Sequence, residues 1–442
     1  MPEIHPYRAI HFDPSRVGDL SRVTAQPYDK IDPSLQEEYY RRDEHNIVRI
    51  ILPKERPGGD KYGEAARTLE DWLRRGLLVQ DPRPAFYAYH QVYRTPEGVK
   101  TRRGFSALVR LEEPGKGRIR PHEQTHTGPK LDRFRLLTAT RTHTEQILLL
   151  YSDPEKVVGR ILEEAVQGPP LLEGRDDFGE LHRVWRLEDP AVGESLRRAM
   201  EPKECIIADG HHRYETSWNY HQEMARRGVP APGPESHECV LATLVDMDDD
   251  LTIFATHRVV FDLPGFDPRR LLESARAHFE IREYPFSDGA GERRARADLL
   301  RDLRLEGRSR PCFGMAARGL PAHALLRVRD LRAAAAAVRE PRSEAWRSLD
   351  VNLLHALILE GILGVGPERL AAEKNVEFLR SADEAVERVL RPGKAQAAFL
   401  VNPVRVDQIR TIVRNGERFP QKATDFYPKL LSGLLLCRLN GS

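Results

Sequence analysis

One stretch of the chain, from Glu204 to Arg227, constrains the fold more than any other. It opens with an apolar run over residues 205–208 that is typical of a buried strand, and Asp209-Gly210 follows at once. Beyond Gly210, apolar residues recur at helical spacing as far as residue 227. A buried strand that turns at a glycine directly into a helix indicates an α/β protein, with the positive end of the helix dipole above the turn.

The first helical turn after Gly210 carries His211, His212 and Arg213. Cations at a helix N-terminus are electrostatically disfavoured, so this cluster favours an anion or metal site over a plain cap with two surface histidines. Arg213 suits phosphate oxygens because it can pair with them in a bidentate manner. Asp209 could cap the helix, bind Mg²⁺ or orient a histidine. We therefore predict a phosphate site at this turn, with Asp209 as a candidate Mg²⁺ ligand.

A polar loop upstream supplies a candidate partner carboxylate. Residues 122–126 read His-Glu-Gln-Thr-His, the zinc-protease pattern, which works only on a helix. Pro121 and Gly128-Pro129 flank it and argue against a helix, so a zinc hydrolase using His122, Glu123 and His126 is a minor alternative. As a loop, the segment predicts Glu123 as a general base beside an anion site. Further phosphate contacts come from Lys130 and Arg133.

The length of 442 residues is too great for one ordinary core. We expect an N-terminal α/β elaboration over residues 1–100 and a catalytic core over 101–262. A helix-rich subdomain over 263–345 and a C-terminal segment over 346–442, packing back on the core, complete the chain. Within the first part the pattern predicts a strand at 46–52, a helix at 60–76 and a hairpin from 85–94 to 101–111.

Charge and composition exclude several classes of protein. Lys and Arg number 69 and Asp and Glu 67, without a basic stripe, so general nucleic-acid binding is not expected. The chain shows no signal-peptide pattern and no run of eighteen apolar residues, and we expect a cytoplasmic protein that does not enter a membrane. The four cysteines are isolated, which argues against disulfides and a cysteine-rich zinc site.

Three motifs together resemble the domain-of-unknown-function 1015 family of prokaryotic proteins. They are Pro-His-Glu-Gln-Thr at 121–125 with its continuation to Arg133, Ala-Asp-Gly-His-His-Arg at 208–213, and Pro-Gln-Lys-Ala-Thr at 420–424 with Phe-Tyr-Pro-Lys-Leu at 426–430. Residues 26–29 (Gln-Pro-Tyr-Asp) and 46–49 (Asn-Ile-Val-Arg) also fit that family. The resemblance covers almost the whole chain.

The Asp-Gly-His-His-Arg turn is also similar to the phosphate loop of the ParB/sulfiredoxin-like fold, above all to free-serine kinases of that group. This resemblance implies an α/β (α+β) fold with a mixed-sheet core. It also implies transfer of a phosphoryl group from ATP or ADP, with Mg²⁺, to free L-serine or a similar hydroxy amino acid.

By the same resemblance, Glu123 would be the base, Asp209 and His211 would act at the phosphates, and Gly210, His212 and Arg213 would complete the phosphate cradle. Further possible substrate or phosphate contacts are Thr125, His257, Arg258, Lys422 and Lys429. The alternative is a nucleotide-binding switch without turnover, as in CTP-dependent ParB proteins. The oligomeric state stays open.

Overall fold

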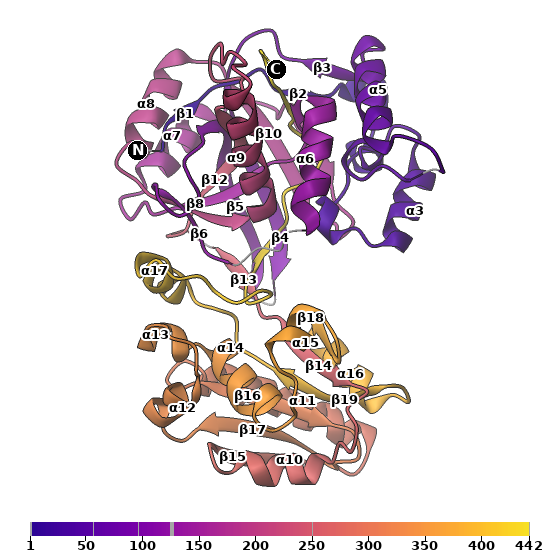
Figure 1. Ribbon diagram of the computed structural model, residues 1–442, viewed down its shortest axis with the longest axis vertical. Coiled ribbons are helices and arrows are strands. Elements are labelled where there is room, and N and C mark those ends of the chain that lie inside the picture. Colours follow the sequence, from indigo (N-terminus) through magenta and orange to yellow (C-terminus); the bar gives the residue numbers. More distant parts are fainter. Residues whose placement is uncertain (1, 56, 96, 124–127, 250, 442) are drawn as a thin grey trace. The chain divides into compact units, whose positions relative to one another are not determined.

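The computed structural model describes residues 2–55, 57–95, 97–123, 128–249 and 251–441. Over these ranges the chain divides into two compact units. The first consists of Met1–Pro121, Thr125–Thr252 and Phe426–Ser442, and the second of His122–Gln124 and Ile253–Asp425. Both are mixtures of helices and strands, so the predicted α/β class is confirmed (Figure 1).

Within the described residues, the first unit is built on a nine-stranded mixed sheet. Its strands run in the order β6-β11-β8-β12-β5-β4-β10-β9, with β1 paired to β5. Two pairs, β6 with β11 and β8 with β12, are parallel, and the others are antiparallel. The strands are β1 (Ile4–His5), β4 (Phe86–Thr95), β5 (Gly98–Arg110), β6 (Ile119–Pro121), β8 (Ile147–Tyr151), β9 (Leu172–Arg175), β10 (Leu181–Leu187), β11 (Cys205–Asp209) and β12 (Cys239–Asp246).

Two short pairs accompany this sheet: β2 (Ile10–Phe12) with β3 (Leu78–Gln80), and β7 (Thr142–His143) with β21 (Cys437–Arg438). The helices of the unit are α1 (Pro14–Val17), α2 (Leu20–Val23), α3 (Pro33–Arg42), α4 (Val48–Ile51), α5 (Lys61–Arg74), α6 (Gly128–Thr140), α7 (Val157–Ala165), α8 (Pro190–Met200) and α9 (His211–Arg226). A 3-10 turn covers Tyr28–Lys30.

The core of the first unit follows from the apolar runs of its central strands. Every residue of β8 and β12 is buried, and alternate residues of β5 and β8 join side chains of α7 and α8 in one cluster. Tyr214 of α9 belongs to the same cluster, while Tyr220 and Met224 pack with Leu137 of α6. Figure 1 shows α9 beside α6. These contacts anchor α9, and with it the turn that precedes it.

The second unit has a six-stranded, fully antiparallel sheet in the order β15-β17-β16-β19-β14-β18, as far as the described residues show. The strands are β14 (His257–Phe261), β15 (Phe279–Pro285), β16 (Cys312–Ala317), β17 (Ala322–Val328), β18 (Val376–Leu379) and β19 (Ala395–Leu400). Helices α11 (Gly289–Glu306) and α16 (Ala382–Leu390) pack against it through leucine, valine and alanine side chains.

The other helices of the second unit are α10 (Pro268–Ala275), α12 (Leu331–Ala337), α13 (Glu344–Arg347), α14 (Asp350–Leu353), α15 (Pro367–Ala371) and α17 (Val406–Arg414), with a π-helical turn at Leu354–Glu360. Two short strands, β13 (Thr252–Phe254) and β20 (Asp425–Tyr427), lie where the chain passes from one unit to the other.

The domain boundaries expected from the sequence differ from this division. Residues 1–100 share one sheet with the expected core, because β4 pairs with β5 from Tyr87 opposite Ser106 to Thr95 opposite Gly98. Residues 263–345, expected to be rich in helices, also contribute β15, β16 and β17 to the second sheet. The tail divides, since residues up to Asp425 belong to the second unit and those from Phe426 to the first.

The strand predicted at 46–52 is wrong: this segment holds the helical turn α4. The Asn46 side chain stabilises the start of this helical turn, because its Oδ1 accepts the N–H of Val48 at 3.0 Å. Its Nδ2 donates to the carbonyls of Arg22 and Thr24 at 2.8 and 2.9 Å. Complete burial of Val48, Ile50 and Ile51 then overrides their preference for strands.

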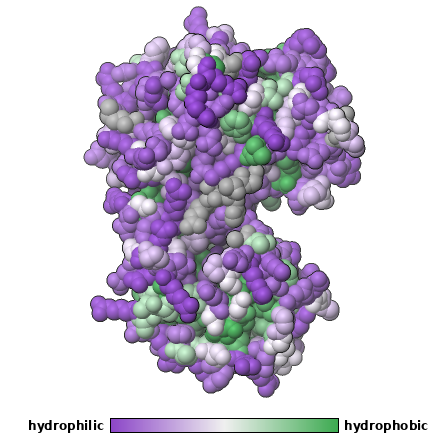
Figure 2. Space-filling view, in the orientation of Figure 1, coloured by the Kyte–Doolittle hydropathy of each residue, from purple (hydrophilic) through white to green (hydrophobic). Residues whose placement is uncertain are grey.

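The surface matches the charged composition. Figure 2 shows a face that is hydrophilic over most of each unit. Large apolar side chains that are well exposed include Val99, Leu131, Phe178 and Leu305, which are spread along the chain. None of the described helices is both long enough and apolar enough to cross a membrane.

Candidate active site

The turn predicted to bind phosphate joins β11 to α9 in the first unit. Cys205 to Ala208 are buried, and the pairing of β11 with β8 shifts register between Ile207 and Asp209. Gly210 has φ +84°, in the left-handed region that favours glycine, and its carbonyl accepts the N–H of Tyr214 at 2.9 Å. The helix therefore begins directly after Gly210, without a side-chain cap at that residue.

Asp209 is a carboxylate surrounded by positive charge. Its Oδ1 accepts the N–H of Gly210 at 2.9 Å, and the Nζ of Lys429 lies 3.5 Å from its Oδ2. Burial opposes its ionisation, but Lys429, Arg213, Lys30 and His211 together hold the pKa of Asp209 well below its usual range. The carboxylate is therefore ionised at neutral pH, and several cations act on it at once.

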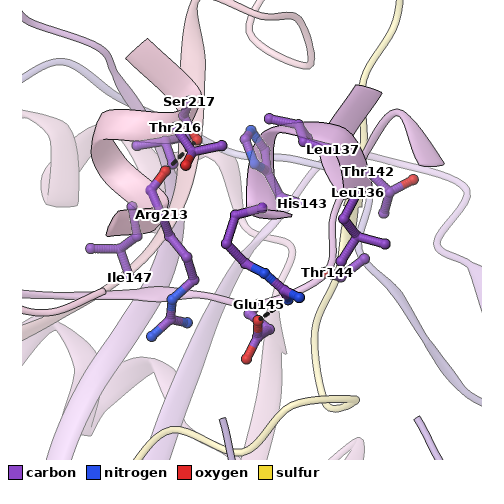
Figure 3. Close-up of a pocket in the computed structure, with 12 residues that line it drawn as sticks. Leu136, Leu137, Thr142, His143, Thr144, Glu145, Ile147, Arg213, Thr216 and Ser217 are labelled. Carbon is purple, nitrogen blue, oxygen red and sulfur yellow. Dashed lines mark hydrogen bonds and ion pairs between the residues drawn. The ribbon is translucent and has the colours of Figure 1, made fainter. Parts of the chain in front are cut away.

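Arg213 folds back over the turn. Its Nη1 donates to the carbonyl of Gln146, and its guanidinium lies so close to Gly210 that an added Cβ there would be 3.0 Å from Nε. Burial opposes its charge, but Glu145, Asp209 and Asp29 raise the pKa of Arg213. In Figure 3, the Arg213 side chain extends downwards from α9 and ends at about the same height in the view as Glu145. Arg213 thus bonds to the main chain of Gln146 and feels the charge of a second carboxylate, Glu145.

Glu145 gathers segments that are distant in the sequence. Its Oε1 accepts the N–H of Tyr28 and the hydroxyl of Ser432, both at 3.0 Å. Its Oε2 lies 3.7 Å from Nη1 of Arg133, whose guanidinium stacks 4.0 Å above the Tyr28 ring. This cluster holds residues 28–30 and the C-terminal segment beside α9.

A cavity of about 40 Å³ lies next to this cluster (Figure 3). Its lining includes Arg133, Glu145 and Arg213, other side chains of α6 and α9, and residues between 142 and 147. That volume holds about three water molecules. It is too small for a nucleotide.

Several of the predicted residues therefore meet in the first unit. Asp209, Gly210, His211, Arg213 and Lys429 gather at the turn. Two others serve neighbouring ion pairs, since Lys130 pairs with Glu215 of α9 and Arg133 with Asp132 and Glu145. His212 is half-buried in the first turn of α9. Thr125 and His126 lie outside the described residues.

The remaining predicted residues belong to the second unit. Glu123 accepts the N–H of Lys422 at 3.1 Å on Oε1, and its main chain bridges to Phe419. His122, the first histidine of the zinc pattern, bonds through Nε2 to the hydroxyl of Thr424 at 2.7 Å. Among the described residues, no group of three or more His, Cys, Asp or Glu side chains is placed to hold a metal ion.

Lys422, His257 and Arg258 make contacts within that unit. The ammonium of Lys422 lies 3.4 Å from Glu373. His257 accepts the N–H of Val401 at 3.2 Å, and burial lowers the pKa of His257 to about 4. The side chain of Arg258 is buried against His355 and the carbonyls of Thr256 and Lys422.

Sequence reasoning missed two cations that act on Asp209. Lys30 directly follows the Gln-Pro-Tyr-Asp motif, which contributes to the family resemblance but by itself indicates no phosphate site. Arg102 lies on β5, where a fully buried arginine has no distinguishing sequence signal. Glu145 was also missed, because its role depends on contacts with Tyr28 and Ser432.

Comparisons with known proteins give a family and distant structural relatives. A family model described as "Protein of unknown function (DUF1015)" matches residues 4–352. A search of the curated proteins found no match. A variant of a free serine kinase in complex with ADP is 12% identical, with 70% of this chain and 84% of that chain covered and a TM-score of 0.33.

Two further solved structures are similarly distant. A conserved hypothetical protein from Pyrococcus furiosus is 13% identical over 70% of this chain and 87% of that one, with a TM-score of 0.30. SbnI from Staphylococcus aureus, truncated at its C-terminus, is 11% identical over 75% and 86%, with a TM-score of 0.33. Likeness at this level does not assign an activity to the chain.

Proposed function

Because the chain belongs to the DUF1015 family, whose description assigns no activity, we propose a function from the site itself: transfer of a phosphoryl group from ATP or ADP to the hydroxyl of free L-serine or a similar hydroxy amino acid. One observation carries the proposal. At the glycine-led start of α9, the carboxylate of Asp209 lies 3.5 Å from Nζ of Lys429, and Arg213, Lys30 and His211 add to the positive charge around it.

This distribution of charge suits a polyphosphate. Phosphoryl transfer needs little covalent chemistry from a protein, and positioning and neutralisation of phosphate charge supply most of the catalysis. Lysine, arginine and a helix N-terminus provide that neutralisation. The ionised Asp209 would hold the Mg²⁺ of the bound nucleotide, because Mg²⁺ in such sites is bound through one or two carboxylates together with phosphate oxygens.

Glu123 remains the proposed base for the acceptor hydroxyl, on the strength of its motif. A carboxylate is a suitable acceptor for a hydroxyl proton, and general-base catalysis contributes about 10²–10⁴-fold to such reactions. Free serine is proposed as the acceptor from the resemblance of the Asp-Gly-His-His-Arg turn to that of free-serine kinases.

The direct test is to incubate the protein with L-serine, Mg²⁺ and either ATP or ADP, and to measure O-phosphoserine by mass spectrometry. We expect product with one of the two nucleotides. Glu123→Gln should lower turnover by about 10²-fold or more while nucleotide affinity is retained, because only the base is removed. Asp209→Asn should weaken Mg²⁺-dependent nucleotide binding as well.

Glu113→Gln is the matched control, because Glu113 is exposed and pairs only weakly with Lys116 at the surface. Folded protein that forms no phosphoserine with either nucleotide would refute the kinase. If that protein still bound nucleotide, and Glu123→Gln bound it equally well, the nucleotide-binding switch would be the better assignment.

A further inference from the structure

Arg102 of β5 is a buried cation whose partners are neutral. Only 3% of its surface is exposed, and its Nε donates to Oε1 of Gln91 at 2.9 Å. Its Nη2 donates to the same oxygen and to the carbonyl of Pro428, the latter at 2.5 Å. In the described part of the chain no carboxylate pairs with it, and Nη1 is buried without a hydrogen-bond partner.

Such an arrangement is costly. A buried arginine is normally paired with a carboxylate, because an unpaired charge loses its hydration without a compensating attraction. Burial lowers the pKa of Arg102 to about 10, which still leaves it protonated at neutral pH. Because no described carboxylate pairs directly with it, the Arg102 guanidinium can attract an anion that binds nearby.

The partners of Arg102 connect it to the proposed phosphate site. Gln91 of β4 donates through Nε2 to the carbonyl of Lys429 at 2.7 Å, so Arg102 and Gln91 together hold the Pro428–Lys429 main chain. The Lys429 side chain, 9% exposed, then reaches Asp209 at 3.5 Å. Asp209 in turn acts favourably on the charge of Arg102.

We propose that Arg102 is a positioning residue of the Asp209 site, which holds Lys429 in place and adds its own charge to the field that binds nucleotide phosphates. The inference rests on the nucleotide binding in the proposed function. The inference depends on the hydrogen-bond partners of Arg102 being neutral. A carboxylate in place of the Gln91 amide would neutralise the charge by direct pairing, whereas the amide orients the guanidinium without neutralising it.

Two substitutions separate charge from shape. Arg102→Gln removes the charge and keeps hydrogen-bond donors, whereas Arg102→Lys keeps the charge. We expect Arg102→Gln to bind ADP about tenfold more weakly than the wild type in the presence of Mg²⁺. Isothermal titration calorimetry at pH 7 measures this affinity. Arg102→Lys should lose less. The loss for AMP should be smaller than for ADP, since AMP carries fewer phosphate charges.

A pH profile adds a signature that a merely structural role would not show. The lysine of Arg102→Lys is buried, so its pKa falls and it loses its charge as the pH rises. ADP affinity of that variant should therefore decrease between pH 7 and pH 9.5, while that of the wild type, whose arginine stays protonated for longer, changes less. Arg103→Gln is the matched control, because Arg103 is exposed and its side chain points to the opposite face of β5.

The outcomes distinguish this inference from the proposed function. If the wild type binds ADP but Arg102→Gln binds it equally well, the inference is wrong and the proposed function stands. If both variants weaken binding equally and in proportion to their loss of thermal stability, Arg102 is only structural and the inference also fails. A folded wild type that binds neither ADP nor pyrophosphate would overturn both. ADP binding that depends on Arg102 without any phosphoserine would support the inference and refute the kinase.

Discussion

At the scale of single residues, the turn before α9 depends on the backbone of Gly210. Its φ of +84° costs an L side chain about 1–2 kcal/mol. An added Cβ would also meet the Arg213 guanidinium at 3.0–3.1 Å, closer than ordinary contact. The glycine is thus needed twice, for the backbone conformation and for the space that Arg213 occupies.

Gly210→Ala should therefore lower the free energy of unfolding by about 1–2 kcal/mol and weaken ADP binding, because the new methyl group displaces Arg213. Urea denaturation and ADP titration measure the two effects. Gly228→Ala at the other end of α9 is the control, since its φ is +68° and no described atom lies within 4 Å of its added Cβ. We expect a similar loss of stability there but unchanged ADP affinity. Equal losses of affinity in the two variants would contradict this account.

At the scale of elements, a buried ion cluster fastens α11 to β17 in the second unit. Glu292 accepts two hydrogen bonds from Arg296, at 2.9 and 2.7 Å, and its Oε1 lies 2.9 Å from Nε2 of His323. Burial opposes ionisation, but Arg296 and His323 bring the pKa of Glu292 below its usual value. The cluster therefore stabilises the folded state while Glu292 is ionised.

Glu292→Gln should destabilise the second unit by about 3 kcal/mol at pH 7, because Arg296 would keep a buried charge without its main partner. A carboxylate with a lowered pKa contributes stability above its unfolded pKa of about 4.3 and loses it as the pH falls. The difference in the free energy of unfolding between Glu292→Gln and the wild type should thus become smaller below about pH 4. Urea denaturation at several pH values measures this.

Glu384→Gln is a matched control for this prediction. Glu384 also pairs with an arginine four residues later, Arg388 at 2.8 Å, but both side chains are about half exposed. An exposed pair of this kind contributes about 0.3–0.5 kcal/mol. Equal effects of the two substitutions would show that burial of the Glu292 cluster does not matter.

At the scale of the whole molecule, each unit has a core of its own, and buried cysteines mark both. Cys205 and Cys239 lie on β11 and β12 of the first unit, and Cys312 on β16 of the second. Burial raises the pKa of each of these three thiols to about 12. Native protein should therefore hold them as unreactive thiols.

With iodoacetamide at pH 8, these cysteines should react more than about a thousandfold more slowly in the native protein than after unfolding, because the thiolate is the reactive form. Digestion and mass spectrometry identify which cysteines are modified as urea increases. Cys205 and Cys239 should become reactive together, since β11 and β12 both pair with β8. Rapid labelling of Cys205 without urea would contradict the burial of β11.

The local elements whose residues form a continuous pattern could be predicted from the sequence alone. The strand, glycine turn and helix over residues 205–226, the hairpin of β4 and β5 and the helix at 61–74 all agree with their apolar spacing. The family resemblance and the α/β class were also readable, because motifs and periodicity are local properties. The segment at 46–52 was not, since its helical turn depends on bonds from Asn46 to residues 22 and 24.

The surroundings of Asp209, in contrast, depend on contacts between distant parts of the chain. Lys30 and Lys429 come from opposite ends of the chain, and Arg102 gains its role through Gln91 and the Pro428 carbonyl. The sequence supplied a turn crowded with cations and a weak candidate in Lys429. Long-range packing placed Lys429 at 3.5 Å from the carboxylate, because side chains of β4 and β5 bond to the main chain of residues 428–431. Such contacts leave no periodic signal, so the sequence predicted the charged residues of the turn itself but not the positions of Lys30, Lys429 and Arg102 around it.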